Sequence, residues 1–389
     1  MKLAERMHRL GTESAFEVAA RARALEAQGS PMIHLEIGEP DFDTPAHIRH
    51  AACDALEAGY THYGPATGLP ELRQVLAKHI ERTRGLAADP ENVIVTPGAK
   101  PIMFYAIMAL VEPGDQVIYP NPGFPIYESM INFIGGEAIP LQLSESRGFG
   151  FEIEDLEALI SDRTRMIILN SPQNPTGGVL PRETLAGIAR LAVQHDLVVL
   201  ADEIYSDILY EGTHHSVLEF PGMLERTILL DGFSKTYAMT GWRLGYGLFP
   251  AALIPHISRL IINSVSCTAS FSQKAAVAAI TGPMDDVEHM VAEFRKRRAL
   301  VIARLNEIKG LRCVMPHGAF YAFPNIQGTG LDSRAYADYL LTQADVAVLP
   351  GTAFGQFGEG YIRISFANSL DNLNEALNRI ERATARLVK

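Results

Sequence analysis

The segment from Asp231 to Arg243 places one lysine and one arginine between two apolar runs. Its sequence is Asp-Gly-Phe-Ser-Lys-Thr-Tyr-Ala-Met-Thr-Gly-Trp-Arg, and residues 227–230 and 244–249 are apolar runs that we expect to be buried strands. A lysine amine attacks a carbonyl only when it is deprotonated, so its pKa must fall below the reference value of about 10.4. Burial near other cations lowers that pKa. Because the flanking runs are too apolar for a solvated loop, Lys235 is the candidate nucleophile.

Two further apolar runs lead into polar residues that could serve such chemistry. Asp202 follows the run 197–201, where a carboxylate is costly unless it meets a cation or hydrogen-bond donors. It is therefore either a helix N-cap or the partner of a positively charged ligand group. Asn174 follows the run 165–169 in an Asn-Pro turn, which by itself indicates only a loop.

The run 93–96 is followed by a glycine turn and then by an apolar helix that begins at Pro101. A strand, a tight glycine turn and a helix with proline in its first turn leave backbone N–H groups free to bind a phosphate. Any strand-to-helix turn has this pattern, so the signal is weak when it is taken alone. The candidate phosphate-binding residues in this turn are Gly98, Ala99 and Lys100.

The elements that must position these groups are strands alternating with helices. Four apolar runs alternate with helical stretches between residues 93 and 231, which predicts a parallel sheet covered on both faces. The polar groups follow the carboxyl ends of these strands, where open α/β sheets bind ligands. We therefore expect them to meet at one site.

Composition limits the class of protein. The chain has 389 residues, which suggests two domains, and its 47% hydrophobic content is sufficient for a large core. A net charge of −11 argues against nucleic-acid or anionic-membrane partners. No apolar run reaches membrane-spanning length, and the N-terminus lacks the apolar core of a signal peptide. We therefore expect a cytoplasmic protein.

Cysteine and histidine do not indicate a metal site or a disulfide framework. The three cysteines, Cys53, Cys267 and Cys313, are scattered and odd in number, which is typical of a reducing compartment. His214 and His215 are adjacent but have no third ligand at metal-binding spacing. We interpret this histidine pair as a solvated turn and expect no metal.

Residues 234–243 resemble, without gaps, the cofactor-lysine segment of class I aminotransferases, which are pyridoxal-phosphate enzymes of fold type I. The resemblance covers nearly the whole chain. It implies an α/β fold whose large domain, residues 40–275, has a mostly parallel sheet covered by helices on both faces. A smaller α+β domain would combine both chain ends, residues 1–39 and 276–389.

The resemblance implies that pyridoxal 5'-phosphate binds at the strand ends. Lys235 would join it as a Schiff base and later shuttle a proton. Asp202 would pair with the protonated ring nitrogen and keep the ring an electron sink. Tyr205 and Asn174 would bind the ring oxygen, and Phe124 would stack on the ring, although core packing is the commoner role of a phenylalanine.

The resemblance also assigns the phosphate contacts. The residues that would hold the phosphate are Gly98, Ala99, Lys100 and Arg243. Many relatives carry a serine or threonine three residues before the lysine as a further phosphate ligand. Here that position is Gly232, and Ser234 is the candidate substitute.

Substrate and partner contacts follow from the same resemblance. Gly38 would lie in a loop that passes close to the substrate. Arg363 together with Asn174 would bind the substrate α-carboxylate. The alternative role of Arg363 is a structural ion pair. Tyr63 would reach across a homodimer interface to the partner subunit's cofactor phosphate; its alternative is a buried core or interface tyrosine. In the aspartate-specific branch, a lysine on the helix after Gly98 meets the distal carboxylate of the substrate. We assign that position to Met108, which places strict aspartate specificity in doubt.

The resemblance implies an aminotransferase that moves an amino group from an L-amino acid to a 2-oxo acid by a ping-pong mechanism. A β-elimination lyase of the C–S lyase type, or a cyclopropane-carboxylate synthase-like enzyme, would use the same lysine, aspartate and arginine. The sequence does not separate these reactions, and it leaves the amino donor and the pathway open.

Overall fold

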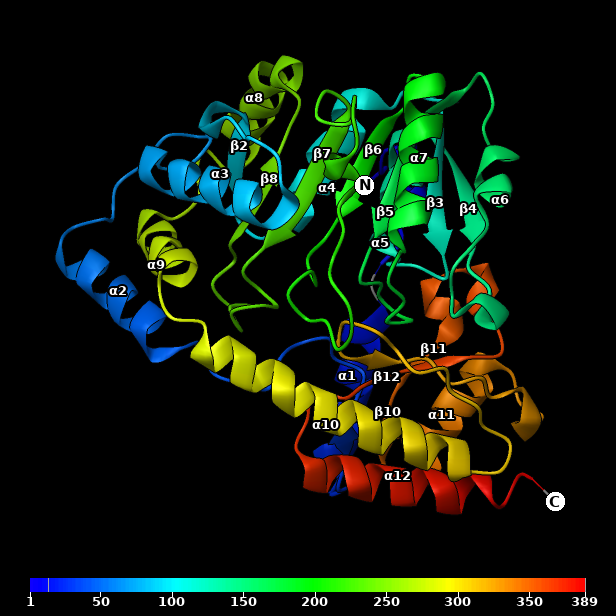
Figure 1. Ribbon diagram of the computed structural model, residues 1–389. Coiled ribbons are helices and arrows are strands. Elements are labelled where there is room, and N and C mark those ends of the chain that lie inside the picture. The colour runs from blue at the N-terminus through cyan, green and yellow to red at the C-terminus, as the bar shows by residue number, and fades with distance from the viewer. Residues whose placement is uncertain (13, 389) are drawn as a thin grey trace.

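The computed structural model describes residues 1–12 and 14–388. Its central sheet has the strand order β2-β8-β7-β6-β5-β3-β4 (Figure 1). The strands of this sheet are β2 (Val93–Thr96), β3 (Gln116–Asn121), β4 (Glu137–Gln142), β5 (Thr164–Asn170), β6 (Val198–Asp202), β7 (Thr227–Gly232) and β8 (Gly245–Leu248). Only β8 runs antiparallel to its neighbours, so the sheet is mostly parallel as predicted.

Helices cover the two faces of this sheet. On β5, Met166 and Ile168 belong to one core cluster with α4 (Lys100–Leu110) and α5 (Ile126–Ile134). Ile167 and Leu169 point to the opposite face and pack with α6 (Ile153–Glu157) and α7 (Arg182–Gln194). Successive side chains of a strand alternate between its faces, so a strand buried on both faces is apolar at every position. The apolar runs in the sequence reflect this double burial.

Two smaller sheets are built from the ends of the chain, and the first of them joins the N-terminal part to the C-terminal part. β1 (Ile33–His34) pairs with β10 (Val346–Ala347). β12 (Ile362–Ser365) lies between β11 (Leu349–Pro350) and β9 (Tyr321–Ala322). The long helix α10 (Asp285–Glu307) crosses below the central sheet and packs on α12 (Leu370–Thr384) (Figure 1). The remaining helices are α1 (Ser14–Glu26), α2 (Ala46–Glu57), α3 (Pro70–Arg84), α8 (Ile254–Ser264), α9 (Ser270–Thr281) and α11 (Ser333–Gln343).

This distribution of strands supports a division of the chain close to residues 40 and 275, which we propose as the domain boundaries. The central sheet uses only residues 93–248, whereas the two smaller sheets use residues before 40 and after 275. In the part of the chain that the structure describes, no helix is both long and apolar enough to span a membrane.

Candidate active site

A cavity of about 460 Å³ lies at the carboxyl edge of the central sheet. The residues predicted from the sequence that line it are Gly38, Ala99, Lys100, Phe124, Asn174, Asp202, Tyr205, Ser234, Lys235, Arg243 and Arg363. They come from the ends of several strands and from both chain ends, as expected for a ligand site at the carboxyl ends of parallel strands. Of the predicted residues, Gly98 and Tyr63 are outside this lining.

One end of the cavity is built by the turn between β2 and α4. Gly98 has φ +88°, and a Cβ atom built there would lie 2.2 Å from Nη2 of Arg243. A Cβ atom on Gly245 would lie 2.4 Å from the backbone nitrogen of Ala99. Gly245 is therefore required for the close approach of two backbone segments, and Gly98 for its left-handed backbone. The result is the N-terminus of α4 next to an exposed arginine, which is an arrangement suited to an anion.

Asp202 is the buried acid of the cavity, and its side chain is held on both oxygens. Tyr127 donates its hydroxyl to Oδ2 at 2.5 Å, and the backbone N–H of Ile204 donates to Oδ1 at 3.3 Å. Burial raises the pKa of Asp202 to about 6, although these two hydrogen bonds lower it. A carboxylate held in this way is poised to accept a cationic partner.

Lys235 follows β7 and enters the cavity beside the loop at Gly38. Its Nζ atom donates to the carbonyl oxygen of Gly38 at 2.5 Å. The same atom lies 6.0 Å from the ring centroid of Tyr205 and 5.9 Å from that of Phe320. The lysine is thus a partly buried amine among aromatic rings, as the apolar runs on either side predict.

Arg363 is a buried arginine whose partners leave it suited to bind an anion. Its Nη1 donates to Oδ1 of Asn174 at 3.0 Å, and its Nη2 donates to the carbonyl oxygen of Glu36 at 2.5 Å. Its Nε is buried and has no hydrogen-bond partner among the described residues. Neither acceptor is a carboxylate, because Asn174 contributes its amide oxygen and Glu36 its backbone carbonyl, so these contacts are not the structural ion pair that the sequence left open.

Tyr321 is a cavity residue that the sequence analysis missed. Its hydroxyl lies 2.8 Å from that of Tyr205, and the guanidinium of Arg363 lies 4.4 Å from its ring centroid. It therefore links the arginine on β12 to the tyrosine that follows β6. In the run Phe-Tyr-Ala-Phe of residues 320–323, no sequence signal distinguishes Tyr321 from its aromatic neighbours. Tyr127, three residues after Phe124, was missed for the same reason.

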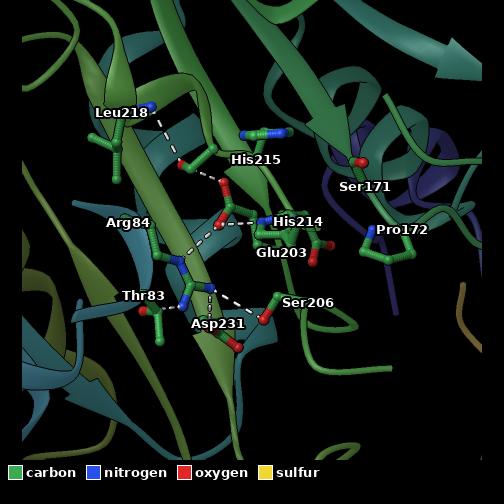
Figure 2. A network of polar contacts seen from close by, with 12 residues as sticks. Thr83, Arg84, Ser171, Pro172, Glu203, Ser206, His214, His215, Leu218 and Asp231 are labelled. Carbon is green, nitrogen blue, oxygen red and sulfur yellow. Dashed lines mark hydrogen bonds and ion pairs between the residues drawn. The ribbon is translucent and has the colours of Figure 1, made fainter. Parts of the chain in front are cut away.

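Behind the cavity, Arg84 at the end of α3 joins two buried acids (Figure 2). Its Nε donates to Glu203 at 3.0 Å, and its Nη2 donates to Asp231 at 2.7 Å. Glu203 follows Asp202 directly, and Asp231 lies near the end of the strand that leads to Lys235. Burial alone would raise the pKa of Glu203, but the charges of His214 and Arg84 and hydrogen bonds from the protein lower it to about 2. The network ties together the ends of β6 and β7.

The interpretation of His214 and His215 as a solvated turn is wrong for the first histidine. The Nε2 atom of His214 lies 3.0 Å from Oε2 of Glu203, and its side chain is only 10% exposed. His215 lies 3.2 Å from Glu219 and is more exposed. Figure 2 shows His214 next to Glu203 within the buried network. The pattern of residues did not predict this contact, because it depends on how the segment after β6 folds back onto Glu203.

The assignment of Met108 to the substrate position is also wrong. Its side chain is 48% exposed and lies outside the cavity lining, whereas Lys100, the first residue of the same helix, lines the cavity. A residue eight positions along α4 is more than two helical turns from the cavity end of that helix. The argument against aspartate as a substrate therefore no longer holds.

The sequence model of the family "Aminotransferase class I and II" matches residues 30–380. The chain belongs to this family. The family uses pyridoxal phosphate, and this chain is accordingly a pyridoxal-phosphate-dependent aminotransferase.

The similar proteins have different substrates in their names. An aspartate aminotransferase of Pyrococcus abyssi is 42% identical over 90% of this chain and 91% of the relative. An aromatic-amino-acid aminotransferase of Thermococcus litoralis is 39% identical over 98% of each chain. The structure of the Thermus thermophilus aspartate aminotransferase with maleate has a TM-score of 0.95 at 38% identity, covering 98% of this aminotransferase and 100% of that chain.

The buried carboxyl of Asp202 predicts a pH-dependent stability in the cofactor-free protein. A folded pKa of about 6 lies above the ordinary value of 3.8, so the folded state binds more protons than the unfolded state between these pH values. Its contribution to the free energy of unfolding is therefore present below about pH 4 and is lost as the pH rises through about 6. The difference in pKa corresponds to about 3 kcal/mol.

The measurement is urea unfolding of the cofactor-free protein and of Asp202→Asn at several pH values. Asparagine does not titrate, so the variant should gain stability relative to the parent as the pH rises from about 4 to about 7. A difference between the two proteins that is constant over this range would contradict the assignment.

Proposed function

We propose that this aminotransferase binds pyridoxal 5'-phosphate in the described cavity and transfers the amino group of an L-amino acid to a 2-oxo acid through Lys235. The observation that carries the proposal is the convergence of Lys235, Asp202 and Arg363 on one cavity from distant parts of the chain. A nucleophilic amine, a buried acid and a carboxylate-binding cation are the groups that the reaction requires.

The residues present fit the cofactor. The N-terminus of α4, with the backbone N–H groups of Ala99 and Lys100, lies next to Arg243 and suits a phosphate. At the end of β6, Asp202 suits a protonated ring nitrogen, and Phe124 offers an aromatic face. The absence of a side chain at position 232 also has a reason, because a Cβ there would lie 3.1 Å from Cα of Gly245. Ser234, which lines the cavity, is the hydroxyl available in its place.

When bound, pyridoxal phosphate supplies an aldehyde that reacts with amines and a ring that accepts electrons from the substrate α-carbon. The Lys235 amine acts as nucleophile and then moves the proton at the substrate α-carbon. The hydroxyl of Tyr205 and the amide of Asn174 would donate hydrogen bonds to the ring oxygen. Arg363 holds the α-carboxylate, which orients the substrate for proton transfer.

We also propose that the enzyme is a homodimer in which Tyr63 serves the partner subunit. Tyr63 is 90% exposed and lines a surface hollow with Cys267, Ser270 and their neighbours, away from the cavity of its own chain. Tyrosine is enriched at protein–protein interfaces, and an exposed tyrosine in a surface hollow suits such an interface. The alternative of a core tyrosine is inconsistent with this exposure.

The cavity accommodates more than one class of amino-donor side chain. Lys100 places a cation at one end, which favours a carboxylate, and the apolar residues Phe16, Ile37 and Met103 also line the cavity. Relatives named for aspartate, for aromatic amino acids and for arginine with pyruvate are 38–42% identical to the chain. We propose that acidic and aromatic L-amino acids are both donors.

The test is an absorbance titration of the purified enzyme with pyridoxal phosphate, followed by single amino acids without a 2-oxo acid. We expect a visible band from the bound cofactor that each true donor converts to the shorter-wavelength band of the amine form. Aspartate and phenylalanine are the first two donors to compare. Loss of the band with release of pyruvate and ammonia from a cysteine-type substrate would instead support the lyase reaction.

A further inference from the structure

Tyr127 lies in the first turn of α5 and is fully buried, with 0% of its side chain exposed. Its hydroxyl donates to Oδ2 of Asp202. Burial, together with the neighbouring Asp202, raises the pKa of Tyr127 well above its ordinary value, so the hydroxyl stays protonated and remains a donor. A hydroxyl that donates to a carboxylate forms a stronger hydrogen bond than one between neutral groups.

The ring of Tyr127 contacts a second residue of the cavity. Its centroid lies 5.5 Å from that of Phe124, with an angle of 79° between the ring planes. This edge-to-face arrangement is a favoured geometry of aromatic pairs. Phe124 itself is only half-buried and faces the cavity, so the buried ring of Tyr127 limits its movement.

Two other buried tyrosines have hydroxyl partners outside the cavity lining. Tyr246 donates to Oδ2 of Asp231 at 2.9 Å, in the network behind the cavity. Tyr336 is equally buried and its hydroxyl lies 2.6 Å from the hydroxyl of Thr384, far from the cavity. Tyr127 differs because its acceptor is the acid of the active site and its ring neighbour is the aromatic residue expected to stack on the cofactor. Core packing explains the burial of Tyr127 but not this pair of partners.

We propose that Tyr127 is a positioning residue of the active site, which orients the carboxylate of Asp202 through its hydroxyl and the ring of Phe124 through its own ring. The inference rests on the proposed function, in which Asp202 and Phe124 contact pyridoxal phosphate. Tyr127 acts on the cofactor through these two residues.

The first experiment compares Tyr127→Phe with Tyr336→Phe as a matched control, because each variant loses one buried hydroxyl. The dissociation constant of pyridoxal phosphate is measured by fluorescence between pH 5 and 9. We expect Tyr127→Phe to weaken binding by about tenfold to a hundredfold, as for the loss of a hydrogen bond to a charged group. In the parent the Tyr127 hydroxyl lowers the pKa of Asp202, so its removal should raise that pKa. The fall in cofactor affinity at acidic pH should therefore begin at a higher pH in Tyr127→Phe than in the parent.

Tyr336→Phe should bind the cofactor as the parent does and should lose a similar amount of stability to Tyr127→Phe, because each variant loses one buried hydrogen bond. Equal affinity and equal pH profiles for Tyr127→Phe and the parent would overturn the role of the hydroxyl. If the parent enzyme itself takes up no pyridoxal phosphate, the proposed function fails rather than the positioning argument.

A double-mutant comparison tests whether the hydroxyl acts through Asp202. In the Asp202→Asn background, Tyr127→Phe should change the cofactor affinity by less than about twofold, because contacting residues are not additive. If Tyr127→Phe weakens cofactor binding in the Asp202→Asn background as much as it does in the parent, the proposal is overturned.

Tyr127→Leu removes the ring as well as the hydroxyl. We expect it to bind cofactor more weakly than Tyr127→Phe, and equal affinities of the two variants would overturn the role of the ring.

Discussion

Replacement of Lys235 by arginine should abolish transamination, with a fall in kcat of at least about 10⁴-fold. Arginine preserves the positive charge, but its pKa above about 12 prevents it from acting as a nucleophile or a base at neutral pH. The cavity should still take up pyridoxal phosphate, because Ala99, Arg243 and Asp202 are unchanged. The measurements are steady-state transamination and the absorbance change with a single amino acid.

Borohydride reduction separates covalent from non-covalent binding in the same experiment. In the parent enzyme, peptide mapping after reduction should find the cofactor on the peptide that contains Lys235. In Lys235→Arg the cofactor should wash out. Lys296→Ala, which removes an exposed lysine paired with Glu293, is the control and should behave as the parent does. A Lys235→Arg variant that keeps more than a hundredth of the parent activity would refute the assignment.

The largest expected effect on stability is that of Arg84→Leu. This change leaves Asp231 buried without its cation and Glu203 with His214 alone, and the side chains of the two acids are only 6% and 5% exposed. Removal of one partner from a buried ion pair costs about 3–5 kcal/mol of the free energy of unfolding. The loss is measured by urea unfolding of the cofactor-free protein at pH 8.

The free energy of unfolding that Arg84→Leu loses should depend on pH. In the parent, Glu203 has a folded pKa of about 2, so its contribution to stability is present above the unfolded value and is lost only as the pH falls through about 2. Burial raises the pKa of Asp231 to about 6 in the parent, although Arg84 lowers it. Without Arg84 the pKa values of both acids should rise, so the stability of the variant should decline more steeply than that of the parent as the pH rises above about 5. The Arg21–Asp338 pair is 53% and 48% exposed, so Arg21→Leu should cost less than about 1 kcal/mol. A similarly small loss for Arg84→Leu would contradict the importance of the network.

Many of the site residues that were predicted from the sequence lie at or just after the ends of doubly buried strands, whereas Gly38, Tyr63 and Arg363 do not. Such strands are apolar at every position, and the polar residue that ends each run is therefore conspicuous, as Asp202 and Asn174 show. The strand β4 was not predicted, because its burial is only partial and its sequence, Glu-Ala-Ile-Pro-Leu-Gln, carries no clear pattern. The antiparallel direction of β8 also could not be deduced from its composition.

The sequence by itself determined the type of fold, the chemistry of the cavity and the residues nearest to that chemistry, because local apolar runs and an ungapped motif carry this information. The tertiary structure alone decided which side chains meet across long separations. Arg84 with Asp231, Tyr127 with Asp202 and Tyr321 with Tyr205 are such pairs. It also showed that Lys100, and not Met108, faces the cavity, since the direction of a side chain on a helix depends on how that helix packs against the sheet.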